Sequence, residues 1–280
     1  MKINYSVATL TAVALSFSGS AAWAQQPGAA AEQRYLSVIS VKVPPAKEAA
    51  FTEHYKTGAG AKAMRARLQA YPKLQRWSLL RAVYAGDPAQ EANYLIASVT
   101  TGAPEEQEPA KRDEITKSAT GMNYAGYMEH VRTMSDTVGT TLSHIHQTTP
   151  GYALAEGDYV VLRRLKTTPG RQQAMNELYR DIRLPLVSER VAAGAMKGWS
   201  YSHLSFPTGT GLPYDATEAT IYKDLASAVG GGGGGTGSTA AARFAKQFPD
   251  KNYTSYTDTL REGSTIVRMD LYRVVAVYTK

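Results

Sequence analysis

The chain has 280 residues, a formal net charge of +7 and no cysteine. Without disulfides the fold must be stabilised by burial, and this length is enough for one large core or two of ordinary size. The basic residues are scattered, with no run of four, so the charge indicates a solvated basic surface and no nucleic-acid partner.

The N-terminal segment has the pattern of a secretory signal peptide. Lys2 precedes an apolar stretch over 7–17, and small residues lead to an Ala-Trp-Ala sequence that ends at Ala24. The apolar stretch is too short to span a bilayer. We expect cleavage after Ala24, a disordered leader over 25–33, and a periplasmic or secreted protein without an integral membrane segment.

One series of predicted elements then occurs twice, in 34–150 and in 151–280. In the first part it comprises a strand (35–43), a helical stretch (46–70), strands 74–85 and 92–100, a helix (110–135) and a strand (139–147). In the second part the corresponding ranges are 158–166, 170–192, 196–206, 216–223, 239–262 and 265–278. Gly58 and Gly60 are expected to break or kink the first helix of the first part, and Pro185 that of the second.

Four blocks of similar sequence support an internal duplication. YLSVISVKVPP at 35–45 aligns with YVVLRRLKTTP at 159–169, and EHYK at 53–56 with ELYR at 177–180. LQRWS at 74–78 aligns with MKGWS at 196–200, and NYxxYxxxVR at 123–132 with NYxxYxxxLR at 252–261. The blocks keep their order and their offsets change only by loop-sized amounts, so the sequence predicts two copies of one fold unit.

The order β-α-β-β-α-β defines a ferredoxin-like unit, an antiparallel sheet with helices on one face. We therefore predict an α+β protein whose two ferredoxin-like halves pack sheet to sheet as a pseudo-symmetric α/β barrel, without joining at their edges. In element order and duplication, 34–280 resembles the dimeric α/β-barrel superfamily. That superfamily includes cofactor-independent monooxygenases, cyclases and isomerases, as well as haem enzymes.

The resemblance implies an exported small-molecule enzyme without a cofactor, acting on an aromatic or polyketide-like compound in the chamber between the sheets. Its known haem enzymes use a helical histidine of the C-terminal half, and neither predicted helix of 151–280 contains one. Two alternatives stay open: a non-catalytic periplasmic binding protein, and a structural protein with a filled chamber. A chamber of ~300 Å³ or more would favour a ligand. The expected partners are a small molecule and, at most, a second copy in a homodimer.

The second strand of each half supplies the candidate binding residues. Large and small side chains alternate there, and we expect the large set to face the chamber. The predicted substrate-binding residues are Trp77, Arg81, Trp199, Tyr201 and Tyr222. The alternative is that these side chains merely fill the barrel.

A catalytic pair is predicted on the hairpin formed by 196–206 and 216–223. If its turn centres between Thr210 and Gly211, His203 lies opposite Glu218. The carboxylate would then orient the imidazole as a general base. The alternatives are a solvated salt bridge, or a register slip that separates the two residues.

His144 and His146 share one face of a predicted strand and could supply two metal ligands. The sequence indicates no third ligand nearby. We therefore predict an ordinary polar pair and no metal site.

Overall fold

The computed structural model describes residues 33–84, 92–209, 211–230 and 237–280. The predicted signal peptide and nearly all of the predicted leader lie outside these residues, as does Thr210 of the expected hairpin turn. Glu32–Lys280 forms one compact unit.

The first series of elements is close to the predicted one. It comprises β1 (Arg34–Lys42), η1 (Pro45–Lys47), α1 (Glu48–Lys56), α2 (Ala59–Ala70), β2 (Leu74–Tyr84), β3 (Tyr94–Thr101), α3 (Pro109–Thr120), α4 (Tyr124–Arg132) and β4 (Asp136–Thr148). The predicted helix break occurs, since Gly58 lies between α1 and α2 as the N-cap of α2. The side chain of Asn123 accepts a hydrogen bond from the Gly126 N–H at 2.8 Å, which explains why α4 begins at this motif.

The second series comprises β5 (Tyr159–Thr167), α5 (Gln172–Leu178), the π-helical turn η2 (Tyr179–Arg183), α6 (Leu184–Ala192), β6 (Gly198–Phe206), β7 (Ala216–Tyr222), α7 (Leu225–Val229), α8 (Gly237–Gln247), α9 (Tyr253–Gly263) and β8 (Ser264–Thr279). A full break at Pro185 is not observed; the regular α-helix is instead interrupted just before this proline, by the π-helical turn η2 between α5 and α6. The helix continues because the Leu184 N–H bonds the Tyr179 carbonyl across η2, and Pro185 lies in the first turn of α6, where a missing N–H costs little. The short helix α7 was not predicted.

The eight strands form a closed barrel in the order β1-β3-β2-β8-β5-β7-β6-β4. Every pair of neighbouring strands is antiparallel. The predicted barrel is therefore present, but the expected packing without shared edges is wrong. Ladders between β2 and β8 and between β4 and β6 join the sheets along both edges. The physical reason is that unpaired strand edges leave backbone groups unbonded, and closing the barrel pairs them.

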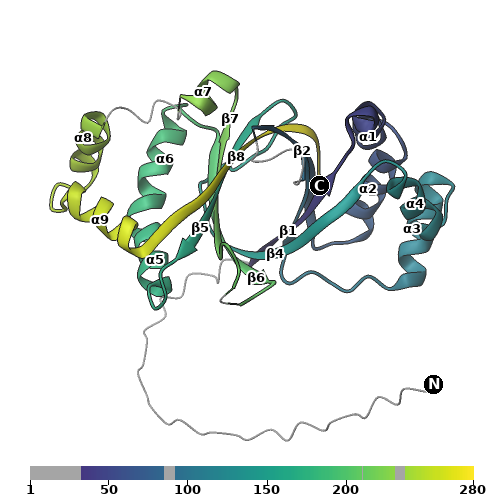
Figure 1. Ribbon diagram of the computed structural model, residues 1–280, viewed down its shortest axis with the longest axis horizontal. Helices are drawn as coiled ribbons and strands as arrows, with labels where there is room; N and C mark the ends of the chain where they lie inside the picture. Colours follow the sequence, from purple (N-terminus) through teal and green to yellow (C-terminus); the bar gives the residue numbers. More distant parts are fainter. Residues whose placement is uncertain (1–32, 85–91, 210, 231–236) are drawn as a thin grey trace, which may run out of the picture. The chain divides into compact units, whose positions relative to one another are not determined.

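The helices lie outside the barrel, with α1–α4 against one part of its wall and α5, α6, α8 and α9 against another (Figure 1). One apolar cluster, including Phe51 and Tyr55, packs beneath the first helical layer. A second, including Tyr179 and Val187, packs beneath the other. A third cluster lies inside the barrel, and its buried members are Leu80, Leu95, Val160, Ile221, Tyr272 and Val274. No helix in the described part of the chain is long and apolar enough to cross a membrane.

Candidate functional site

A buried carboxylate organises the outer face of the second sheet. Glu218 of β7 is almost completely buried and contacts Arg183 of η2. Its Oε1 accepts hydrogen bonds from Trp199 Nε1 at 2.6 Å and from Arg183 Nε at 2.9 Å. Its Oε2 accepts one from Arg163 Nη1 at 3.1 Å. The cluster thus links β5, β6, β7 and η2 through one side chain.

The environment keeps this carboxylate ionised. Burial alone would raise the pKa of Glu218, but the charges of Arg183 and Arg163 and the hydrogen bonds to the carboxylate lower it from 4.5 to about 2. The pKa of the neighbouring Tyr179 hydroxyl is raised well above its usual value by burial and by the charge of Glu218. Neither group is therefore poised to exchange a proton near neutral pH.

A pocket of about 390 Å³ opens beside this cluster, and we call it the outer pocket. It is lined by Arg163, Leu165, Tyr179, Arg183, Glu218, Leu260, Arg261, Ser264, Thr265 and Ile266. Three guanidinium groups face a single carboxylate, so the lining is net positive. Arg163 Nε is buried and has no hydrogen-bond partner among the described residues. Aliphatic side chains and Tyr179 form the rest of the wall, so the pocket suits a ligand with an apolar body and a negative group.

The predicted His203–Glu218 pair does not form. In the observed register Glu218 lies opposite Tyr201, and His203 lies opposite Ala216. The pairing is shifted by two residues from the predicted one. A shift of two residues keeps His203 and Glu218 on the same face of the sheet, which is the face toward the helices, but gives each a different cross-strand partner. His203 Nε2 bonds Asn176 Oδ1 at 2.7 Å, and its Nδ1 lies 3.3 Å from Gln172 Nε2.

The predicted direction of the large side chains on the second strands is also wrong. Trp77 stacks on Tyr55 of α1 with ring centroids 5.3 Å apart, so it faces the helices. Tyr179 of η2 stacks on Trp199 and Tyr201 at 6.0 and 3.9 Å. The alternate residues of these strands, which include Ser78 and Ser200, therefore face the barrel interior.

The remaining predicted residues have separate environments. Arg81 is half-exposed and forms an ion pair with Glu48 at 2.5 Å. Tyr222 is buried in the same apolar cluster as Trp199 and Tyr201. Of the predicted residues, the structure thus brings Trp199, Tyr201 and Glu218 together beside the outer pocket, while Trp77 and Arg81 belong to the other half.

His144 and His146 lie side by side on β4, with His144 Nδ1 3.3 Å from His146 Nε2. A third histidine is close, since the rings of His146 and His203 have centroids 4.7 Å apart. Both nitrogens of His203 are nevertheless occupied by α5 side chains. Among the described residues no group of three or more His, Cys, Asp or Glu side chains is placed to hold a metal ion.

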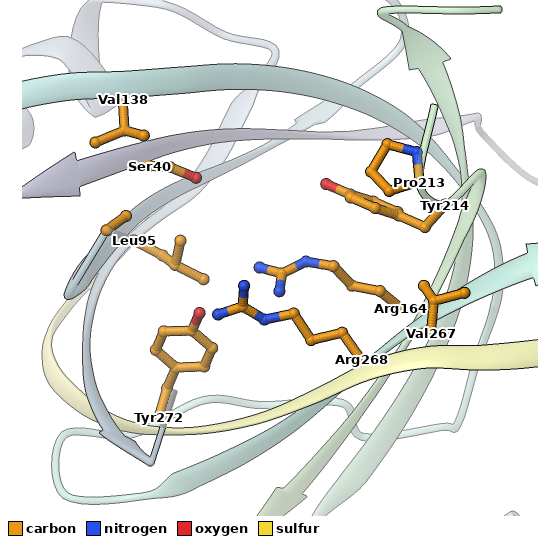
Figure 2. A pocket seen from close by; sticks show the side chains of 10 residues that line it. Ser40, Leu95, Val138, Arg164, Pro213, Tyr214, Val267, Arg268 and Tyr272 are labelled. Atoms are coloured by element: carbon orange, nitrogen blue, oxygen red, sulfur yellow. The ribbon is translucent and has the colours of Figure 1, made fainter. Parts of the chain in front are cut away.

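A second pocket, the inner pocket, lies within the barrel and has a volume of about 340 Å³ (Figure 2). The arginines Arg164 and Arg268 project into it from β5 and β8. The interior therefore contains the expected chamber, but none of the predicted binding residues lines it. Both pockets exceed the ~300 Å³ that favours a ligand over a filled interior.

Sequence reasoning missed the arginines of both pockets. Arg163 and Arg164 are adjacent on β5, so strand alternation directs one to each face of the sheet. Two adjacent arginines within an otherwise apolar strand were the available signal. Arg183 belongs to η2, and its distance in sequence from β7 offered no such signal.

The lining of the outer pocket does not suit haem, the group bound by the haem enzymes of the superfamily that the sequence resembles. Its described lining contains no histidine or cysteine, and its one tyrosine has a hydroxyl whose ionisation is disfavoured. These residues do not fit an axial ligand for haem iron.

No protein-family model and no curated protein matches the sequence. Among solved structures, the "putative monooxygenase from Lactobacillus acidophilus NCFM" superposes with a TM-score of 0.51 at 8% identity, over 89% of this chain and 97% of that one. A "putative monooxygenase" from Fusobacterium nucleatum gives 0.51 at 10% identity, over 90% and 96%. At the level of fold, this agrees with the predicted resemblance to the dimeric α/β-barrel superfamily. The chain therefore has the fold of these monooxygenase-type proteins.

Proposed function

We propose that this chain is an exported, cofactor-independent enzyme of the monooxygenase type. Its substrate would be an aromatic or polyketide-like phenol or enol bound in the outer pocket. The observation that carries the proposal is the buried Arg163 Nε, which has no partner among the described residues and belongs to a net-positive, partly aromatic pocket of about 390 Å³. A buried donor without a partner costs roughly 1–3 kcal/mol, and an ionised substrate oxygen would satisfy it.

The proposed role of the outer pocket is to stabilise an oxyanion. Arg163 and Arg183 would lower the free energy of the enolate that forms when a substrate CH₂ group conjugated with a carbonyl group loses a proton. The electron-rich enolate is the form that reacts with dioxygen. One oxygen atom enters the product as a new carbonyl, the other leaves as water, and the substrate CH₂ group supplies the four electrons and two protons.

The proposal is tested by oxygen uptake with anthrone and its hydroxylated derivatives. Arg163→Gln should lower kcat/KM about tenfold or more, because it removes a charge-assisted hydrogen bond from the transition state. Arg132→Gln is the matched control, since Arg132 on α4 is exposed and pairs only loosely with Glu129, at 3.6 Å. If neither Arg163→Gln nor Arg132→Gln changes the rate of oxygen uptake, the outer pocket is excluded as the active site.

A second candidate, a non-catalytic binding protein, is favoured by one observation. The titrating groups that line the outer pocket have pKa values far from neutrality: about 2 for Glu218 and well above 10 for Tyr179. A substrate would then have to ionise in solution, or give its proton to water. Saturable binding of the same probes, with no oxygen uptake and complete recovery of the probe, would select this candidate.

The proposal also covers the cellular location of the protein and its origin by duplication. We propose cleavage after Ala24 and export to the periplasm, supported by the sequence pattern. A tandem origin of 34–150 and 151–280 is supported by the aligned blocks and by corresponding strand orders, β4-β1-β3-β2 and β8-β5-β7-β6. The intact mass of the protein from a periplasmic extract would locate the cleavage, and its native mass would distinguish a monomer from a homodimer.

A further inference from the structure

His144 and His146 lie on a part of the barrel wall that solvent can reach. Their strand β4 pairs with β1 of the first series on one side and with β6 of the second series on the other. It therefore lies where the two helical layers part (Figure 1). The side chain of His144 is half-buried and that of His146 is exposed, so a dissolved ion can approach both rings.

A β-bulge brings the two imidazoles together. In the β4–β6 ladder the partners of Ile145 and Gln147 are successive residues of β6, so His146 is the extra residue of the bulge. Residues two apart in a regular strand lie about 6.6 Å from each other along the strand. The ring centroids of His144 and His146 are only 4.5 Å apart. Bulges redirect side chains in this way beside functional sites.

The spacing of the facing nitrogens matches that of two ligands on one metal ion. His144 Nδ1 lies 3.3 Å from His146 Nε2. Two nitrogens that each bind a tetrahedral ion at about 2.0–2.1 Å are roughly 3.3 Å apart. Without an ion, one ring donates its N–H to the other. A change of tautomer in the donating ring presents both lone pairs to an ion, and neither ring loses its remaining N–H.

Neighbouring side chains restrict the positions of both rings. His144 lies against Tyr35, with centroids 5.2 Å apart, and His146 lies against His203 at 4.7 Å. Both nitrogens of His203 bond side chains of α5, so His203 supports the ring of His146 and does not itself face an ion. Burial lowers the pKa of His144 and of His146, so protons do not compete for these nitrogens near pH 7. The pair is thus ordered before any ion binds.

We propose that His144 and His146 form a surface site for one divalent transition-metal ion, with Cu²⁺ bound more tightly than Zn²⁺. Imidazole nitrogen suits both ions, and Cu²⁺ forms the stronger complex with a given set of ligands. Two side chains are fewer than the three or four of a catalytic or structural site, so water would complete the coordination. Mg²⁺ and Ca²⁺ prefer oxygen ligands and should not bind here. Neither histidine lines the outer pocket, so this site does not depend on the function proposed for that pocket.

The test is calorimetric titration of the full chain with Cu²⁺ and with Zn²⁺, in a buffer that does not bind metal ions. His144→Gln and His146→Gln should each weaken the strongest Cu²⁺ site about tenfold or more. The double variant should match the single variants within about twofold, because the loss of either ring already leaves a single imidazole. His130→Gln is the matched control, since His130 on α4 is also exposed and lies beside a second histidine, with its ring centroid 5.2 Å from that of His54. It should leave the Cu²⁺ affinity unchanged.

NMR of the imidazole nitrogens identifies the ligands directly. Zn²⁺ should shift the signals of His144 and His146 together, with saturation at one equivalent, and leave those of His130 in place. This measurement on the wild type, together with His146→Gln at an exposed position, keeps the test valid if His144→Gln does not fold. Losses that add in the double variant would show two independent imidazoles. That result, or equal Cu²⁺ affinity in wild type and His146→Gln, would overturn the proposal.

Discussion

Replacing Glu218 by glutamine should destabilise the fold in a way that depends on pH. The lowering of the Glu218 pKa from 4.5 to about 2 corresponds to roughly 3 kcal/mol of stabilisation when the carboxylate is ionised. Because the folded pKa is below the unfolded one, this stabilisation is complete above the unfolded pKa and is lost as pH falls towards 2. Roughly 2 of those 3 kcal/mol should already be lost at pH 3. Glu218→Gln should therefore lower the free energy of unfolding by about 3 kcal/mol at pH 7 and by about 1 kcal/mol at pH 3.

Urea unfolding followed by tryptophan fluorescence measures this effect, since Trp199 is fully buried and bonds Glu218 directly. Glu129→Gln is the matched control. The side chain of Glu129 is 73% exposed and its ion pair with Arg132 is a surface pair, so the loss should stay below about 1 kcal/mol at both pH values. A loss in Glu218→Gln that is the same at pH 3 and pH 7 would show that the buried charge is not the source of the stabilisation.

Two further predictions concern the packing around the histidines. In an NMR titration His203 should have a pKa of about 4, because burial and the nearby His146 disfavour its charged form. The stabilisation from burying neutral His203 is then present above pH 6.5 and is lost as the pH falls towards 4. A titration midpoint near 6.5 would contradict this burial. Gly60→Ala should lower the free energy of unfolding by about 1–3 kcal/mol, since the added Cβ would lie 2.5 Å from His54 Cδ2. Gly139→Ala is the control and should be neutral, because a Cβ at Gly139 would have no atom within 4 Å. Equal effects of the two substitutions in thermal unfolding would refute the assigned packing.

The sequence by itself located the strands and their order, but it did not locate every helix, since α7 was not predicted and the helices predicted over 110–135 and 239–262 are each divided into two. Hydrophobic alternation located all eight strands, and the break at Gly58 followed from the conformational freedom of glycine. The second tyrosines of the repeated motif, Tyr127 and Tyr256, occupy equivalent buried positions in the two helical layers. These features depend on residues close together in the chain, where local propensity decides.

The tertiary structure alone decided which face of each strand points inward. Alternation shows that Trp199 and Ser200 lie on opposite faces, but only closure of the barrel determines which face has room for an indole. The register of β6 on β7 depends on a connection whose length does not dictate its shape, so Glu218 pairs with Tyr201 and the predicted partner His203 bonds α5 instead. The site was predictable only in part, because Arg183 reaches Glu218 from 35 residues away, through contacts that exist only after the helices pack on the barrel.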